Sequence, residues 1–151
     1  MPRALDVANE IIRDAAERGI TVTNLSLQKL AYFAHGWHLA LTGEPLIEEG
    51  FEAWRFGPVV PSLYHKFKLY SSNPIPPDHP LADTPPLDEA ARAVIVKVIE
   101  VFGGRSGFEL VGLSHDPAGP WHRVFHDPAI GATIPDRDIG RYFKQLAGAG
   151  A

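Results

Sequence analysis

One apolar stripe constrains the fold more than any other part of the sequence. It lies in a segment that starts near Asn24 or Ser26 and stops at Gly43. Either starting residue can cap the exposed amides of a helix, and glycine often ends one. Between these signals, apolar residues and one histidine recur three and four positions apart, which predicts a long helix at the centre of the fold. The stripe comprises Leu27, Leu30, Ala31, Ala34, His38 and Leu41.

The other expected helices have start and stop signals of their own. Glycines end two apolar-periodic segments, proline is well placed in a first helical turn, and Ser106 with Glu109 has the form of a capping box. Residues 115–134 are turn-rich. We expect helices over residues 3–18, from Pro61, over 87–102, from 107 to 113 or 114, and from Pro135 to about Leu146.

The segment from Pro45 to Phe56 predicts the β part of the fold. Leu46-Ile47 and residues 51–55 are two candidate short strands, joined through residues 48–50 into a small hairpin. Gly57-Pro58 should end the second strand before the next helix. The fold class that follows is mainly α with a small β-hairpin (α+β), in a compact single-domain bundle of about five to six helices.

Length and proline content predict the domain organisation. A chain of 151 residues is about one domain long and can bury its own core. Residues 74–86 contain six prolines, a composition that favours a loop over helix or strand. We expect one domain over residues 1–146, a Pro-rich internal loop over 74–86, and a flexible C-terminal tail over 147–151.

Composition excludes several classes of protein. A net charge of -4 disfavours a general binder of nucleic acid, although a DNA-binding autoregulator with a local basic patch stays an alternative. The absence of cysteine excludes disulfides and thiolate metal sites, and it fits a reducing compartment. No apolar run approaches the roughly 18 residues of a membrane span, and the N-terminus lacks the apolar core of a signal peptide. We therefore expect a cytoplasmic protein with no membrane partner.

One cluster could carry metal chemistry. Imidazole and carboxylate groups can bind zinc or iron, and five of them lie close together in the sequence: His115, Asp116, His122, His126 and Asp127. Their spacing matches no standard metal motif. A metal-dependent hydrolase or nuclease remains an alternative, but the chain also lacks a Gly-x-Ser-x-Gly elbow and a phosphate-binding loop. We expect no enzyme activity, no catalytic residue, no metal and no cofactor.

Residues 52–64 are rich in the side chains that dominate protein interfaces. Trp, Tyr and Arg are the most frequent binding hot spots, and this segment contains all three. Arg55 can clamp a partner carboxylate through two hydrogen bonds. An internal ion pair with Glu52 or Glu109 is the alternative for this guanidinium. Nearby Lys66 and Lys68 could extend the surface toward an acidic partner, or could form an ordinary solvated helix face.

Three blocks of the sequence resemble one known family. The first is Leu27-Gln28-Lys29-Leu30 and the residues up to Leu46, the second runs from Ala53 to Pro61, and the third holds Glu109-Leu110, Ser114-His115 and Pro120-Trp121. In this order and separation they resemble the Panacea antitoxin domain, also called the phage-associated GepA or SocA-like family. The resemblance covers roughly residues 5–125. The third block departs from the family, which usually has threonine at position 114 and a shorter path to Pro-Trp.

The resemblance implies a bacterial antitoxin that neutralises a cognate toxin by direct protein contact, without established catalysis. Some members are thought to deliver the toxin to an AAA+ protease of the ClpXP type, which requires a second surface, here the C-terminal tail or the basic helix after Pro61. The predicted partner-binding residues are Trp54, Arg55, Phe56, Tyr64, Lys66, Lys68 and His115. The predicted structural residues are Gln28, Lys29, Trp37, Gly57, Pro58 and Trp121.

Overall fold

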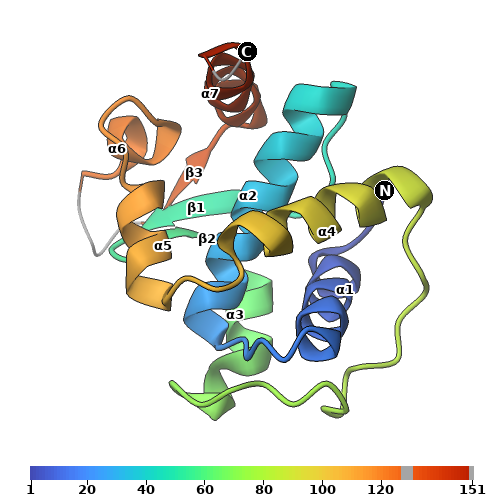
Figure 1. The fold of residues 1–151 in the computed structure, drawn as a ribbon. Coiled ribbons are helices and arrows are strands. Elements are labelled where there is room, and N and C mark those ends of the chain that lie inside the picture. Colours follow the sequence, from blue (N-terminus) through green and yellow to red (C-terminus); the bar gives the residue numbers. More distant parts are fainter. Residues whose placement is uncertain (127–130, 150–151) are drawn as a thin grey trace.

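Helix α2 (Asn24–Thr42) passes through the middle of the molecule, and the other helices pack around it (Figure 1). The computed structural model describes residues 1–126 and 131–149. The predicted mainly α fold with a small β part is confirmed. The remaining elements are α1 (Ala4–Glu17), β1 (Phe51–Trp54), β2 (Gly57–Val59), α3 (Pro61–Phe67), the 3-10 helix η1 (Lys68–Tyr70), α4 (Glu89–Phe102), α5 (Gly107–Ser114), α6 (Pro120–Val124), β3 (Ala132–Ile134) and α7 (Asp136–Ala149).

Helix α2 is buried on nearly all sides, which confirms its predicted central position. Its cap is Thr23, whose hydroxyl accepts a hydrogen bond from the Ser26 amide at 3.2 Å, so the helix begins one residue after the capping hydroxyl. Gly43 ends the helix with a φ of 78°, a left-handed conformation that glycine adopts readily. A helix buried on all sides must be covered by several neighbours, and α1, α4, α5 and α7 provide this cover.

Helix α7 packs closely on α2 because a glycine leaves room for an aromatic ring. The ring of Phe143 occupies the space that a side chain on Gly36 would need. Beside it, the buried His35 donates from Nε2 to Asp136 Oδ1 at 2.8 Å and accepts from the Ile47 amide at Nδ1, at 3.1 Å. The first bond fixes the first turn of α7 to the middle of α2, and the second fixes the segment before β1 to the same side chain.

The sheet has the order β2-β1-β3, and both pairings are antiparallel. The predicted hairpin partner of β1 is wrong: Leu46-Ile47 is buried in the core but forms no strand. Gly57-Pro58 belongs to β2 itself, contrary to the expectation that it ends the β segment. Proline fits there because β2 is at the edge of the sheet, where one side of the strand makes no ladder bonds. The local apolar pattern of Leu46-Ile47 does not distinguish a buried coil from a strand.

The Pro-rich loop over 74–86 contains neither helix nor strand. It is nevertheless attached to α1 by a buried polar contact. His79 Nε2 lies 2.7 Å from Asn9 Oδ1, and Asn9 Nδ2 donates to the Leu81 carbonyl at 2.9 Å. Ile75 also donates its amide hydrogen to the Val22 carbonyl at 2.8 Å. The loop is therefore a fixed cover over the lower end of the bundle in Figure 1.

Two short elements were not predicted in the turn-rich stretch: α6 and β3. Both are too short for a periodic pattern to reveal them. Helix α7 continues to Ala149, so it includes residues 147–149 that we had assigned to the tail, while residues 150–151 and Asp127 lie outside the described residues. Among the described helices, none has the length and apolarity that a membrane crossing requires.

Candidate partner-binding surface

Two adjacent side chains of α2 fasten β2 to the helix. Gln28 Oε1 accepts a hydrogen bond from the Val60 amide at 3.1 Å, and its Nε2 donates to Asn24 Oδ1 at 3.0 Å. Lys29 Nζ donates to the Pro58 carbonyl at 2.6 Å. Both side chains are buried, so these bonds lie out of water. The first and second sequence blocks are thus joined by hydrogen bonds that satisfy backbone groups of a short strand.

Lys29 is an unusual buried cation. It makes no ion pair with any carboxylate in the described part of the chain. Burial lowers its pKa from the ordinary 10.5 to about 7. Gly57 lies directly against it: a side-chain carbon on this glycine would approach Ser114 Oγ to 2.5 Å and Lys29 Cε to 2.7 Å. Because Gly57 also has a φ of +102°, both the space and the backbone require glycine here.

The third block supports the hairpin from the other side. The rings of His115 and Trp121 stack with centroids 3.7 Å apart and an interplanar angle of 8°. Trp121 Nε1 then donates to the Trp54 carbonyl at 2.8 Å. Burial lowers the pKa of His115, and the charges of Lys29 and His122 lower it further, which favours a neutral imidazole in this stack.

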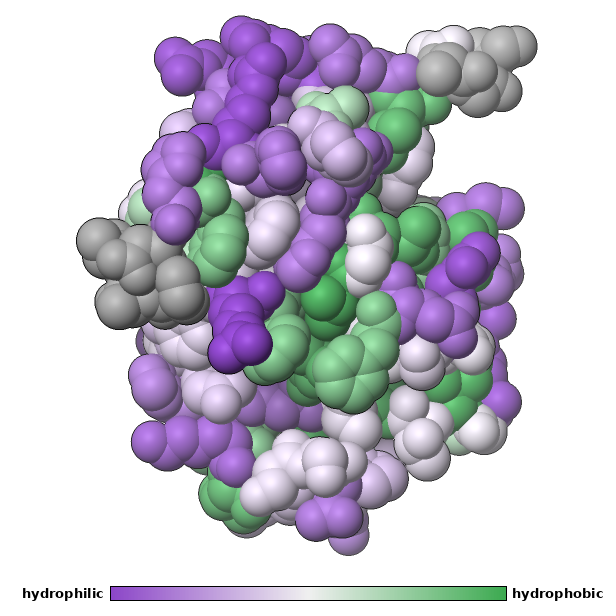
Figure 2. Space-filling view, turned by 90° about the vertical axis from the view of Figure 1, so that its left-hand side faces the viewer, coloured by the Kyte–Doolittle hydropathy of each residue, from purple (hydrophilic) through white to green (hydrophobic). Residues whose placement is uncertain are grey.

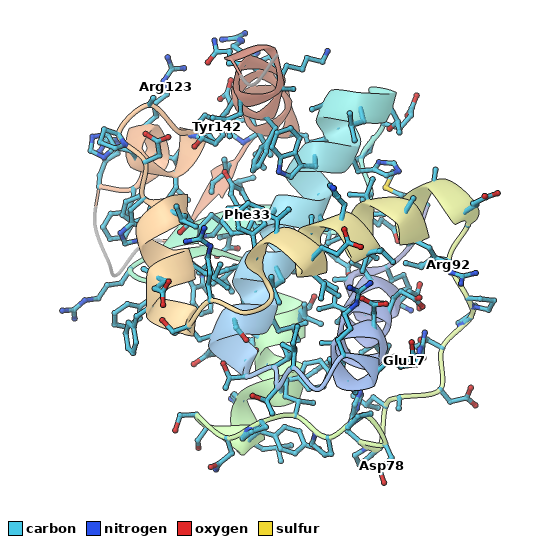
Figure 3. All side chains as sticks on the ribbon, in the orientation of Figure 1. Glu17, Phe33, Asp78, Arg92, Arg123 and Tyr142 are labelled. Carbon is cyan, nitrogen blue, oxygen red and sulfur yellow. The ribbon has the colours of Figure 1, made fainter. Side chains whose placement is uncertain are left out.

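Side-chain hydrogen bonds hold the connection between α5 and α6. The Ser114 hydroxyl donates to the Val111 carbonyl at 2.8 Å. Asp116 accepts from the Ala118 amide at 3.0 Å and from the Tyr142 hydroxyl at 2.6 Å. The bond from Tyr142 is the main reason that the pKa of Asp116 is lowered. Figure 3 shows Tyr142 on α7 facing α6, so Asp116 ties this connection to α7.

The tip of the β1–β2 hairpin points to solvent. Arg55 and Phe56 form the turn, and Phe56 is 49% exposed. Its ring lies edge-on to the ring of Phe108 on α5, with centroids 6.4 Å apart, and Phe108 is 73% exposed. The Arg55 guanidinium lies 5.6 Å from the centroid of Phe56. Figure 2, which shows the side that carries α5 and α6, has apolar side chains reaching the surface in the middle of this face.

The structure excludes one of the two roles considered for Arg55. Glu52 accepts a hydrogen bond from Trp54 Nε1 at 3.0 Å, and Glu109 pairs with Arg105 at 4.0 Å. Arg55 makes no ion pair with any residue that the structure describes. The alternative of an internal pair with Glu52 or Glu109 is therefore wrong, and the guanidinium faces outward.

A pocket of about 380 Å³ adjoins the tip. Five of the predicted partner-binding residues line it, and two of them, Trp54 and Tyr64, pack edge-to-face in its wall with ring centroids 5.1 Å apart. None of the described residues that line it is acidic. We call this part of the pocket, together with the adjoining Phe108 ring on α5, the hairpin-tip surface. It comprises Leu25, Trp54, Arg55, Phe56, Tyr64, Lys68 and Phe108.

Comparison with known proteins identifies the family. The Antitoxin SocA-like, Panacea domain family matches residues 27–122, a range that contains the hairpin, its attachment to α2 and the His115–Trp121 stack. This chain belongs to the SocA-like antitoxin family. It is 36% identical to Antitoxin SocA of Caulobacter vibrioides (strain NA1000 / CB15N) over 160 aligned positions, which cover 95% of this chain and 85% of the relative. No solved structure is significantly similar to it.

Two predicted partner-binding residues of this SocA-like chain lie apart from the hairpin-tip surface. Lys66 lines a separate pocket together with Asp6 and Glu49. His115 is half-buried in its stack with Trp121, and its Nε2 atom is buried without a hydrogen-bond partner in the described part of the protein. Trp37, one of the predicted structural residues, packs its ring against Phe143 with centroids 5.3 Å apart.

Sequence reasoning missed Phe108. Its position inside a capping box drew attention to the backbone, whereas the informative signal is the apolar composition of the whole short helix. Residues 107–114 contain a single charged side chain. A helix that is apolar on every face leaves apolar side chains exposed wherever neighbouring elements do not cover it. Phe108 and Leu113 are the exposed apolar side chains that result.

The cluster that the alternative metal site would need does not assemble in the described residues. No group of three His, Cys, Asp or Glu side chains within residues 1–126 and 131–149 is arranged to hold an ion. His122 and His126 are exposed, whereas His115 is stacked on Trp121. Asp127, the last member of the cluster, lies outside the described residues.

Proposed function

We propose that this member of the SocA-like antitoxin family neutralises a cognate toxin by binding it through the hairpin-tip surface, without catalysis. One observation carries the proposal: the outward-facing Arg55 and Phe56 form a turn whose base is buried and hydrogen-bonded, and the exposed ring of Phe108 on α5 lies beside that turn. A rigid base lowers the entropy lost when the turn binds a partner. Exposed aromatic rings beside an arginine are the usual composition of a binding hot spot.

The chemistry of this surface also indicates which side chains its partner should carry. Arg55 can hold a carboxylate through two parallel hydrogen bonds, and Lys68 adds a second positive charge at the same pocket. With no acidic lining among the described residues, the pocket favours a partner surface that is negatively charged. The toxin should therefore place an acidic side chain beside an apolar one.

We also propose that the chain delivers the bound toxin to a cytoplasmic AAA+ protease of the ClpXP type. The antitoxin would then act as an adaptor and survive while its partner is degraded. The test follows toxin turnover by the purified protease and ATP with and without this chain. Faster turnover with the chain supports the adaptor role, and unchanged turnover leaves neutralisation by occlusion alone.

The direct test of binding is co-expression with the product of the neighbouring gene. That product should stop growth when expressed alone, and the wild-type chain should restore growth. The Phe56→Ala/Phe108→Ala variant should restore growth poorly, because its toxin affinity falls by about thirtyfold, the equivalent of roughly 2 kcal/mol at a hot spot.

Leu41→Ala is the matched control, since Leu41 is 68% exposed and apolar but lies at the end of α2, outside the hairpin-tip surface. It should restore growth fully. A neighbouring product that is harmless alone, or toxic despite the wild-type chain, would refute the toxin partnership. Equal rescue by both variants would refute the assignment of the surface.

A further inference from the structure

A second groove lies between α7 and the end of α2, and it shares no lining residue with the hairpin-tip surface. Its volume is about 700 Å³. Leu39, Pro45 and Gly140 contribute an apolar floor, and the buried Gly140 brings α7 close to Leu39. The groove is therefore a shaped depression beside a helix rather than an isolated row of surface charges.

Three cations of α7 form one wall of this groove: Arg137, Arg141 and Lys144. Residues four and three positions apart on a helix lie on the same face. Arg141 and Lys144 make no ion pair with any other described residue, whereas Arg137 contacts Asp138 at 3.4 Å. The wall thus holds two cations with no internal counter-charge in the described structure.

Among the described residues, Asp136 is the one acid that lines the groove, and one of its carboxylate oxygens already accepts a hydrogen bond. Asp136 Oδ1 accepts the hydrogen bond from His35 Nε2 at 2.8 Å. The groove is therefore positively charged within a chain whose net charge is -4. Such a local inversion of charge attracts and orients a negatively charged partner.

We propose that this groove binds an acidic, extended segment of a partner protein. From residue 137 to residue 144 the helix rises about 10 Å, the length of roughly three extended residues. This reach suits a short run of carboxylates with an apolar side chain set on Leu39 and Pro45. A long polyanion such as DNA fits less well, because its charge extends beyond the groove over a chain that is negative overall.

The groove gives this small protein a docking site separate from the hairpin-tip surface, because the two sets of lining residues do not overlap. The inference rests on the charge and shape of the groove alone. It holds whether or not the hairpin-tip surface binds a toxin.

The test measures binding of a short fluorescein-labelled peptide of glutamate and alanine by fluorescence anisotropy at low salt. The wild-type chain should bind it, and a peptide with glutamine in place of glutamate should not bind. Arg141→Glu/Lys144→Glu should weaken binding by about tenfold or more, because both cations without internal partners are reversed. Both positions are exposed, so circular dichroism should show an unchanged fold.

Lys97→Glu/Arg123→Glu is the matched control, because it makes the same change in net charge at an exposed lysine and an exposed arginine outside the groove. It should change peptide affinity by less than about twofold. Equal losses in both double variants would show attraction to overall charge and overturn the proposal. Failure of the wild-type chain to bind the peptide, or tighter binding of a DNA duplex that the groove variant abolishes, would overturn it as well.

Discussion

The base and the tip of the β1–β2 hairpin are neighbours in sequence but meet opposite environments. At the base, Gly57 and Pro58 are buried against α2, and the carbonyl of Pro58 accepts from Lys29. At the tip, one residue earlier in the chain, Phe56 is half-exposed and Arg55 faces solvent. The difference shows that a dense sequence motif can combine two functions: its buried half fixes the strand, and its exposed half is available for a partner.

The unfavourable burial of Lys29 at the base of the hairpin is as informative as the hydrogen bonds there. A buried ammonium without a carboxylate partner is unfavourable, and a hydrogen bond to a carbonyl offsets only part of this penalty. Lys29 is in this situation among the described residues, and its pKa is lowered for that reason. Substitutions at the base should therefore change the free energy of unfolding strongly, whereas substitutions at the tip should leave it nearly unchanged.

The largest expected effect is at Gly57. Gly57→Ala adds a carbon against Ser114 and Lys29 and forces a side chain into a φ of +102°. Overpacking and left-handed strain together should lower the free energy of unfolding by about 2–5 kcal/mol, measured by urea denaturation. Gly104→Ala is the control, with no atom within 4 Å of the added carbon and an expected change below about 1 kcal/mol. Equal stabilities of the two variants would refute the close packing at the base.

The next effect tests the hydrogen bonds of Gln28. Gln28→Leu leaves the buried Val60 amide without its acceptor and Asn24 Oδ1 without its donor. An unsatisfied buried group costs about 1–3 kcal/mol, so the urea midpoint should fall clearly. Gln145→Leu changes the same side chain at an exposed position of α7 and should stay within about 0.5 kcal/mol of wild type. A wild-type midpoint for Gln28→Leu would show that β2 is held by packing alone.

The third effect is a pH dependence caused by Lys29. The folded state releases this proton near pH 7, whereas the unfolded chain keeps it until about pH 10.5, so the unfolded state binds more protons between these values. The free energy of unfolding should therefore rise with pH in this window, by at most about 1.4 kcal/mol per pH unit, and be insensitive to this group below it.

Lys29→Met removes this titration while keeping an unbranched side chain. The difference in unfolding free energy between wild type and Lys29→Met should shift in favour of wild type from pH 7 to pH 9.5, measured in urea at each pH. Lys97→Met replaces an exposed lysine and should show no such trend. A difference that stays constant with pH would contradict the buried, weakly compensated ammonium.

The smallest effect is expected at the tip. Arg55→Ala/Phe56→Ala removes two side chains without backbone strain, because neither residue has a positive φ. The free energy of unfolding should change by less than about 0.5 kcal/mol, although the same variant should lose toxin affinity. A loss of stability comparable to that of Gln28→Leu would end the distinction between base and tip.

Several features of the fold were predictable because their signals are local. The long stripe before Gly43, the capping box at Ser106 and the proline at position 61 all identified real helices. The absence of a strand at Leu46-Ile47 was not predictable, since two adjacent buried apolar residues suit coil and strand alike. The short α6 and β3 lacked the length that a periodic pattern needs.

The candidate site was predictable as a set of residues but not as a surface. Trp54, Arg55 and Tyr64 attracted attention because their side-chain types are frequent at interfaces. The sequence could not show that Arg55 faces outward, nor that Phe108 lies beside Phe56 from more than fifty positions away. These facts depend on how α5 packs against the hairpin, which no local pattern records.

The sequence by itself determined the longer helices, the family and the residue types of the hairpin, because caps, periodicity and motif order are properties of neighbouring positions. Only the tertiary structure decided that Lys29 is buried, that Gly57 must lack a side chain, and that Arg55 is exposed. Each of these outcomes is set by atoms from distant segments, such as the Pro58 carbonyl that accepts from Lys29. Burial, not residue type, therefore separates the half of the motif that builds the protein from the half that can bind.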